Sequence, residues 1–226
     1  MGGLVIAALV ASVLLIAHSS LLSARHVHVV GNKMTSEQAI LSASGLGTHP
    51  PLIDINSGAI AASIERLPWI ASAVVARSWP DGVSITVTER NPVASIPEGK
   101  SGFAIIDSTG RVLAFVRAKP RSLVPLSVPL RPLVAGSKLD AAGVALARVA
   151  AAVPESILSN IAAVQESSLG VEITLRSGTL VEFGQATELA AKMVALDTLL
   201  STPSVVLGAK SSVDLRVPDA PVVTSR

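Results

Sequence analysis

Two histidines lie two residues apart, and their spacing is the first feature of the sequence that could bind a metal. His26 and His28 alternate with valines, so on a strand their imidazoles would share one face and could offer two ligands. No third histidine and no carboxylate lies nearby in the sequence, and the chain of 226 residues has no cysteine. We therefore interpret the pair as one face of a strand and predict no metal site.

The sequence motifs that carry catalysis are also missing. There is no Gly-x-Ser-x-Gly elbow, Walker A loop, His-Glu-x-x-His helix or Gly-x-Gly-x-x-Gly turn. The acidic residues are scattered, and a cap, a turn or the surface explains each of them, so they form no acid–base pair. We predict no catalytic residue, no cofactor and no enzymatic activity, and an exported enzyme of unknown type stays a disfavoured alternative.

The composition indicates a folded protein rather than a disordered one. Apolar residues make up 50% of the chain and aromatic residues only 2%, so the core must consist of Val, Leu, Ile and Ala. This aliphatic content can offset the entropy lost when the chain orders. The net charge is +2, and no Lys and Arg cluster is interleaved with aromatic residues, so we expect no nucleic-acid partner.

An apolar run at the N-terminus predicts a membrane anchor. Residues 4–17 are apolar apart from Ser12, and Leu21 and Leu22 extend the run. A helix of about 20 residues spans the roughly 30 Å of a bilayer's hydrocarbon core. We predict a transmembrane anchor over residues 1–24. The alternatives are a cleaved signal peptide, which here would lack a basic start and a good cleavage site, and a buried core helix.

The charges beside this run do not match the expected orientation. Arg25 and His26 follow it and no Lys or Arg precedes it, which by the positive-inside rule favours the opposite sense. We hypothesise that a basic cytoplasmic stretch before Met1 is missing, through truncation or a misassigned start.

The residues after the anchor predict a strand and then a helix. Residues 26–30 have strand character, and Gly31-Asn32 ends the strand with turn chemistry. Thr35 is expected to cap the helix, because Gln38 follows in the capping-box position. Gly45 is expected to stop the helix.

A second helix and two strands complete this region. Asn56 or Ser57 is expected to cap the helix. Strands are predicted over 73–77 and 83–88, and the second alternates apolar and polar residues, as a strand with one buried face does. Between them, Pro80-Asp81-Gly82 is a turn in which Pro fixes φ and Gly supplies a positive φ. The predicted order is strand, helix, helix, strand, strand.

This order resembles a POTRA domain, and several runs resemble the bacterial cell-division family FtsQ/DivIB. Residues 27–32 fit the first strand of that family. The other runs that carry the resemblance are Leu67-Pro68-Trp69-Ile70, residues 74–77, Trp79-Pro80-Asp81, residues 87–90 and Pro92-Val93-Ala94. The resemblance covers nearly the whole chain. It implies an α+β protein with a transmembrane anchor over 1–24, a POTRA domain over 25–91, a β-rich domain with helices over 92–218, and a tail over 219–226.

The pattern of the second region is consistent with that implication. Two hairpins are predicted, over 103–116 around Gly110 and over 171–183 around Gly178. Helices are expected after Asp140 and over 187–200. The proline-rich residues 119–133 are expected to form an extended connection, and residues 157–164 a strand or a short helix.

The last predicted strand is the candidate binding site. Val213-Asp214-Leu215-Arg216-Val217 alternates apolar and polar residues, and prolines follow it. Proline cannot donate to a ladder, which confines its segment to an edge or an end of a sheet. An open edge can be completed by an extended partner through strand addition. The alternative is that this strand only closes the sheet.

The Val-Asp-Leu-Arg run also resembles the final strand of FtsQ, and the resemblance implies that the septal partners FtsB and FtsL dock there. No aromatic residue follows the strand, so docking would depend on backbone pairing and on two valines rather than on an aromatic anchor. The predicted partner-binding residues are Val213, Asp214, Leu215, Arg216, Val217, Pro218, Asp219, Ala220, Pro221, Val222 and Val223.

The function follows from the resemblance alone. It implies a scaffold that binds FtsB- and FtsL-like partners, meets other division proteins through its POTRA domain, and links early division proteins to septal peptidoglycan synthesis. It also implies a single-pass protein of the inner or plasma membrane, with a cytoplasmic N-terminus and an extracytoplasmic ectodomain concentrated at the septum. The alternative is another POTRA-bearing export or outer-membrane assembly component, whose large barrel this chain is too short to supply.

Overall fold

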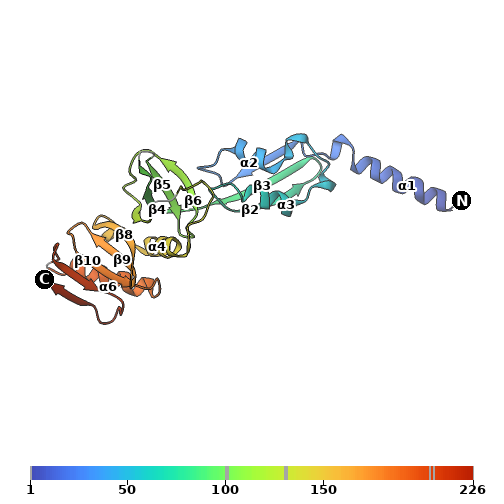
Figure 1. The fold of residues 1–226 in the computed structure, drawn as a ribbon. Coiled ribbons are helices and arrows are strands. Elements are labelled where there is room, and N and C mark those ends of the chain that lie inside the picture. The colour runs from blue at the N-terminus through green and yellow to red at the C-terminus, as the bar shows by residue number, and fades with distance from the viewer. Residues whose placement is uncertain (1, 100–101, 130–131, 204, 206, 226) are drawn as a thin grey trace. The chain divides into compact units, whose positions relative to one another are not determined.

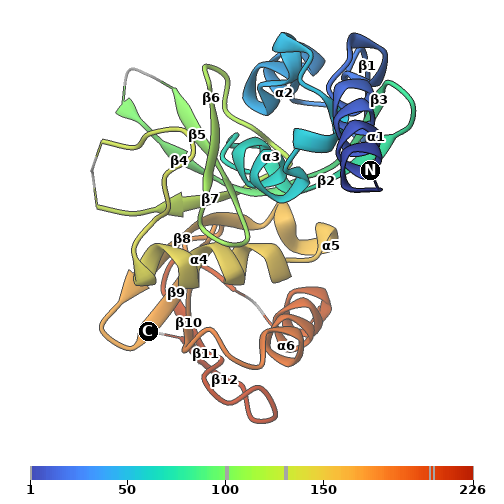
Figure 2. The same ribbon diagram turned by 90° about the vertical axis from the view of Figure 1, so that its right-hand side faces the viewer.

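The structure is a computed structural model that describes residues 2–99, 102–129, 132–203, 205 and 207–225. The chain divides into two compact units, Met1–Arg90 and Asn91–Arg226. Figures 1 and 2 together label the elements of both units, and each unit is described by itself. The first unit begins with α1 (Gly2–Ala17), an apolar helix of 16 residues. Within the described residues, no helix is both long and apolar enough to cross a membrane.

The rest of the first unit is a three-stranded sheet with two helices. The strands are β1 (His26–Val30), β2 (Ile70–Ser78) and β3 (Gly82–Glu89), in the order β1-β3-β2. β3 pairs in parallel with β1 and antiparallel with β2. The helices are α2 (Glu37–Ser44) and α3 (Ser57–Ile64), joined through the short 3-10 turns Leu46–Thr48 and Leu52–Asp54; another, Ser20–Leu22, precedes β1. The predicted strand–helix–helix–strand–strand order is confirmed.

The alternation of β3 places its apolar residues in the core. Val83, Ile85 and Val87 are buried at 3% exposure or less, together with Ile40 of α2 and Ile64 of α3. The strand therefore has one buried face, as its period of two predicts.

Two local predictions in this unit are wrong. The helix cap is Ser36 and not Thr35: the Ser36 side chain accepts the Ala39 N–H, while the Thr35 N–H donates to the Glu89 carboxylate at 2.7 Å. Gly82 does not have a positive φ. It begins β3 opposite Ser78, where a Cβ would lie 2.9 Å from the Ser78 carbonyl oxygen, so close backbone approach is what favours glycine there.

The second unit contains a sheet of nine strands in the described part of the chain, in the order β12-β11-β10-β9-β8-β7-β4-β5-β6. The strands are β4 (Pro92–Pro97), β5 (Phe103–Asp107), β6 (Val112–Val116), β7 (Val124–Ser127), β8 (Ile161–Ser167), β9 (Gly170–Leu175), β10 (Leu180–Gly184), β11 (Ser211–Asp214) and β12 (Val222–Ser225). The helices are α4 (Ala141–Ala152), α5 (Glu155–Leu158) and α6 (Leu189–Ser201).

The helices α4 and α6 pack on one face of this sheet, and the core lies between them and the strands. α4 contacts β4, β7 and β8, and Figure 2 shows it lying across these middle strands. Leu146 and Val149 of α4 and Met193 and Leu196 of α6 are buried in one cluster with the inward residues of the strands. Lys192 is buried among them, and its Nζ donates to the carbonyl oxygens of Phe183 and Gln185 at 2.9 and 3.0 Å.

Both predicted hairpins are confirmed, because β5–β6 and β9–β10 pair antiparallel around Gly110 and Gly178, which both have positive φ. Asp140 caps α4 as predicted and accepts the Gly143 N–H at 2.9 Å. Residues 155–167 form both alternatives in turn, first α5 and then β8.

The extended connection predicted over 119–133 contains a paired strand that the prediction missed, and residues 130 and 131 of this range lie outside the described residues. The middle of the range forms β7, which joins the two halves of the sheet by pairing in parallel with β4 and with β8. Val124 and Leu126 are buried on one face of β7. The strand spans four residues, so the missing N–H of Pro125 interrupts only a short ladder.

Candidate partner-binding edge

The last strands of the sheet differ from the predicted edge. β11 begins at Ser211 and ends at Asp214, and it lies between β10, its parallel neighbour, and β12, its antiparallel neighbour. Val213 and Asp214 are therefore paired on both sides, and the prediction that their strand is the edge is wrong. The chain continues through a loop that contains Pro218 and Pro221 and returns as β12. In the described residues, no strand lies beyond β12 at this end of the sheet.

The alternation of the Val-Asp-Leu-Arg run has a structural explanation. Val213 and Leu215 have no exposed surface and belong to the core. Asp214 and Arg216 project from the other face of the sheet. The pattern of two buried aliphatic residues and two polar ones thus fixes which face of β11 meets the helices.

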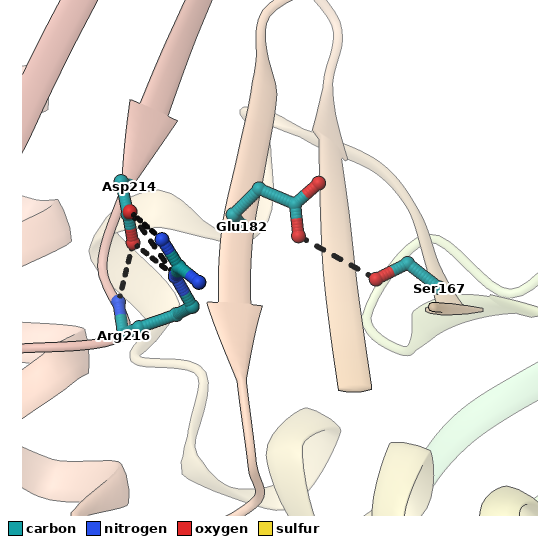
Figure 3. A network of polar contacts seen from close by, with 4 residues as sticks. All are labelled: Ser167, Glu182, Asp214 and Arg216. Carbon is teal, nitrogen blue, oxygen red and sulfur yellow. Dashed lines mark hydrogen bonds and ion pairs between the residues drawn. The ribbon is translucent and has the colours of Figure 1, made fainter. Parts of the chain in front are cut away.

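Asp214 and Arg216 form a clamp at the end of β11 (Figure 3). The Asp214 carboxylate accepts the Arg216 main-chain N–H at 3.0 Å and the Nη2 and Nε groups of the same guanidinium at 2.6 and 3.0 Å. The side-chain bond from Arg216, then the bond from its main chain, hold the pKa of Asp214 below its ordinary value. The Arg216 stem lies over Gly184 of β10, where a Cβ would be 2.8 Å from Arg216 Cγ. The clamp therefore fixes where the chain leaves β11 and turns toward β12.

The direction of the backbone groups identifies the open side of β12. The Leu215 N–H donates to the Glu182 carbonyl oxygen of β10 at 2.8 Å. Backbone groups alternate sides along a strand, so those of Val213 also face β10 and those of Asp214 face β12. Asp214 is opposite Val222, and Val213 is opposite Val223. The N–H and C=O of Val222 therefore pair with β11, while those of Val223 point away from the sheet.

The predicted segment thus contains three structural parts. Val213 to Leu215 are internal, residues 216–221 are the loop, and Val222 and Val223 begin the edge strand with exposures of 57% and 41%. The edge strand also includes Thr224 and Ser225, which the sequence prediction missed. A pattern of only four residues after two prolines gives little signal for a strand, and the pairing to β11 is non-local.

Two carboxylates face one another on the side of the sheet opposite the core, next to this edge. Glu182 of β10 lies directly opposite Glu172 of β9, and its Oε2 accepts a bond from Ser167 at 3.4 Å (Figure 3). Burial raises the pKa of Glu182, and the charge of Glu172 raises it further. Gln165 of β8 donates to Glu172 at 2.6 Å. This polar row runs toward Asp214 and ends at Val222 of β12.

The two histidines that opened the sequence argument lie on one exposed face of β1, as predicted. The Nδ1 of His26 is 3.1 Å from Asp81 Oδ2. Within the described residues, no group of three or more His, Cys, Asp or Glu side chains is placed to hold a metal ion.

Comparison with known sequences identifies the two units. Residues 22–90 match the sequence model of the POTRA domain, FtsQ-type, and residues 94–216 match that of the cell division protein FtsQ/DivIB, C-terminal. The chain belongs to the FtsQ/DivIB family of cell division proteins. The predicted family is thus confirmed, as is a mixed α/β fold with a POTRA-type domain and a β-rich C-terminal domain.

The chain is similar to FtsQ proteins of several bacteria. The chain is 29% identical to the cell division protein FtsQ of Caulobacter vibrioides over 201 residues, which cover 88% of this chain and 63% of that protein. It is 30% identical to FtsQ of Streptomyces venezuelae over 204 residues, covering 86% and 72% of the two chains. It is 25% identical to FtsQ of Streptomyces griseus over 211 residues, covering 92% and 99%. This FtsQ-family chain therefore spans 63% of the length of its Caulobacter relative.

Proposed function

We propose that this FtsQ-family chain is a non-enzymatic division scaffold that captures an extended segment of an FtsB- or FtsL-like partner along β12. The open outer side of β12 is the observation that carries the proposal. An unpaired edge offers main-chain donors and acceptors to an added strand, and the exposed valines beside it offer apolar contact. In this proposal the scaffold links early division proteins to septal peptidoglycan synthesis.

Strand addition along β12 also fits the lack of an aromatic anchor in the C-terminal segment. No aromatic residue lies in residues 213–226, so the segment lacks the side-chain type that most often dominates an interface. Main-chain pairing along β12 needs no such anchor. The Asp214–Arg216 clamp would then act on binding indirectly, because it fixes the turn that leads into β12.

We further propose that the N-terminal segment 1–24, which contains α1, tethers the protein to the inner or plasma membrane, with the N-terminus in the cytoplasm and the residues after this segment outside. Its side chains support this: Leu4 and Leu15 are 80% and 75% exposed, which is unfavourable in water and favourable in lipid. The proposal places the protein at the septum, with the POTRA domain free for other division proteins. A fluorescent fusion that labels the cell periphery evenly would contradict the septal location.

Cysteine cross-linking tests the edge directly, because the natural chain has no cysteine. Val223→Cys would be expressed in dividing cells with single cysteines placed along the partner segment. If a strand adds to β12, a disulfide should form with the partner residue directly opposite Val223 and not with the residues on either side of it, whose side chains point to the other face of the strand. Val194→Cys is the matched control, since Val194 is 66% exposed and lies on α6 rather than on the edge strand.

The two variants separate the outcomes. Cross-linking of position 223 to one partner position but to neither of its sequence neighbours, and none at 194, supports strand addition. Equal cross-linking at both positions, or cross-linking of position 223 to adjacent partner residues alike, shows that the partner does not pair with β12.

A further inference from the structure

A pocket of about 460 Å³ opens in the second unit where the parallel strands β7 and β8 begin. The loop before β7, the connection from α5 to β8, and the end of β9 line it. Three of the lining side chains are cations, Lys119, Arg121 and Arg176, and none of the lining residues that the structure describes is acidic. The lining of the pocket does not include β12, since β10 and β11 lie between β9 and that edge strand.

Arg176 is held in place by the connection from α5 to β8. Its main-chain N–H donates to the Asn160 carbonyl oxygen at 2.7 Å, and its Nε donates to the Ser159 carbonyl oxygen at 2.7 Å. These two bonds hold the guanidinium in one orientation and use only one of its nitrogens, Nε. Within the described residues, its two terminal nitrogens donate to no protein group. A ligand could therefore bind them without displacing an existing bond.

Lys119 and Arg121 likewise have no hydrogen bond or ion pair with a carboxylate in the parts of the chain that the structure describes. Cations that share a pocket repel one another, and an anion bound between them would offset that repulsion. The rest of the lining is mainly apolar, with Leu123, Leu158 and Ile161 beside the charges. The volume is in the range of about 300–1,000 Å³ that small-ligand sites occupy.

We propose that this pocket binds a phosphate-type group, a phosphate or pyrophosphate, that carries an apolar moiety. The guanidinium fork matches two phosphate oxygens, and a lysine adds a point charge. A phosphate with a charge of about −1.5 to −2 balances three cations better than a single carboxylate does. The site is independent of the partner edge, so it stands or falls separately from the proposed scaffold function.

Titration of the purified full-length chain with inorganic pyrophosphate tests the site, with binding followed by calorimetry. Saturable binding with one site per chain is expected, and Arg176→Gln should weaken it about tenfold or more, the effect of losing a charge-assisted hydrogen-bond donor. The Lys119→Gln/Arg121→Gln double variant should weaken it as well. These two side chains make no bond within the described protein, so this variant should fold even if Arg176→Gln does not. Arg148→Gln, which changes an exposed arginine of α4 outside the pocket, is the matched control.

The source of the phosphate is distinguished with vesicles. Co-sedimentation with phosphatidylglycerol vesicles that Arg176→Gln reduces and Arg148→Gln does not, without pyrophosphate binding, assigns the site to a lipid headgroup. Binding of pyrophosphate with the same variant pattern assigns it to a soluble or polymeric phosphate. The proposal is overturned by no binding of either probe, by equal losses in Arg176→Gln and Arg148→Gln, or by polyglutamate binding as tightly as pyrophosphate.

Discussion

Val223→Pro changes the outer side of β12 while leaving its inner side intact. The Val223 N–H points away from β11, so proline at this position removes a donor that the folded protein does not use in its own sheet. Proline is tolerated on edge strands when its missing N–H faces solvent. We therefore expect the free energy of unfolding to change by no more than about 0.5 kcal/mol.

The effect on partner capture should be much larger. An added strand would place a carbonyl oxygen opposite Val223, and proline leaves that oxygen without a donor. An unsatisfied buried polar group costs about 1–3 kcal/mol, which corresponds to a loss of about 5- to 150-fold in affinity. The proline ring also occupies the space that the added strand needs, so the upper part of this range is expected.

The assay measures the dissociation constant of the purified chain for an FtsB-like partner segment, beside urea unfolding of each variant. Val223→Ala is the first control, because it removes side-chain contact and keeps the donor. Val222→Pro is the second, because Val222 pairs with Asp214 and its replacement should destabilise the end of the sheet. If Val223→Pro binds as tightly as Val223→Ala, the outer side of β12 is not the line along which the partner docks.

Three further predictions concern stability. Burial, then the charge of Glu172, raises the pKa of Glu182 above 4.5, so the folded state binds the proton of this carboxyl more tightly than the unfolded state does. The free energy of unfolding should therefore fall as the pH rises from 4.5 through the raised pKa of the folded state. Glu182→Gln should remove this fall in urea titrations at several pH values, and an unchanged slope would contradict the assignment. Burial would raise the pKa of Glu89, but bonds from the main chain of Met34, Thr35 and Lys33 lower it more, so its stabilisation is present above 4.5 and lost as pH falls through the folded pKa. Glu89→Ala should cost about 1–3 kcal/mol at neutral pH, measured by urea unfolding, and a neutral effect would show that these bonds add no net stability. Gly31→Ala should destabilise the first unit by about 1–3 kcal/mol in thermal unfolding, because the φ of Gly31 is +91° and a Cβ would meet the Val87 carbonyl oxygen. Stability equal to that of the wild type would show that the turn can relax.

Local patterns in the sequence were sufficient to predict secondary structure where a residue's neighbours along the chain set its conformation. The alternation over 83–88 predicted β3, and Gly110 and Gly178 marked the turns of two hairpins. Asp140 marked the start of α4, because its side chain can reach an N–H three residues ahead. The cap of α2 shows the limit of such rules: Thr35 and Ser36 are equally suitable types, and the distant Glu89 engages the Thr35 main chain.

The candidate site was predicted as a segment but not as a geometry. Residues 213–223 were chosen for their alternation and their prolines, and this segment does contain the last turn of the sheet. Its division into an internal strand, a loop and an edge strand depends on pairing of β11 with both β10 and β12. Such pairing joins residues that are far apart or separated by a loop, and no period in the sequence encodes it.

The sequence by itself determined the family, the order of elements in the first unit, and the absence of a recognisable catalytic motif, since each of these follows from residue types at fixed short spacings. The tertiary structure decided which strand ends the sheet, which way Val223 points its backbone groups, and that Arg176 shares a pocket with Lys119 and Arg121. Backbone hydrogen bonds have the same chemistry at every residue. Only the folded chain decides which of them are already paired and which are left for a partner.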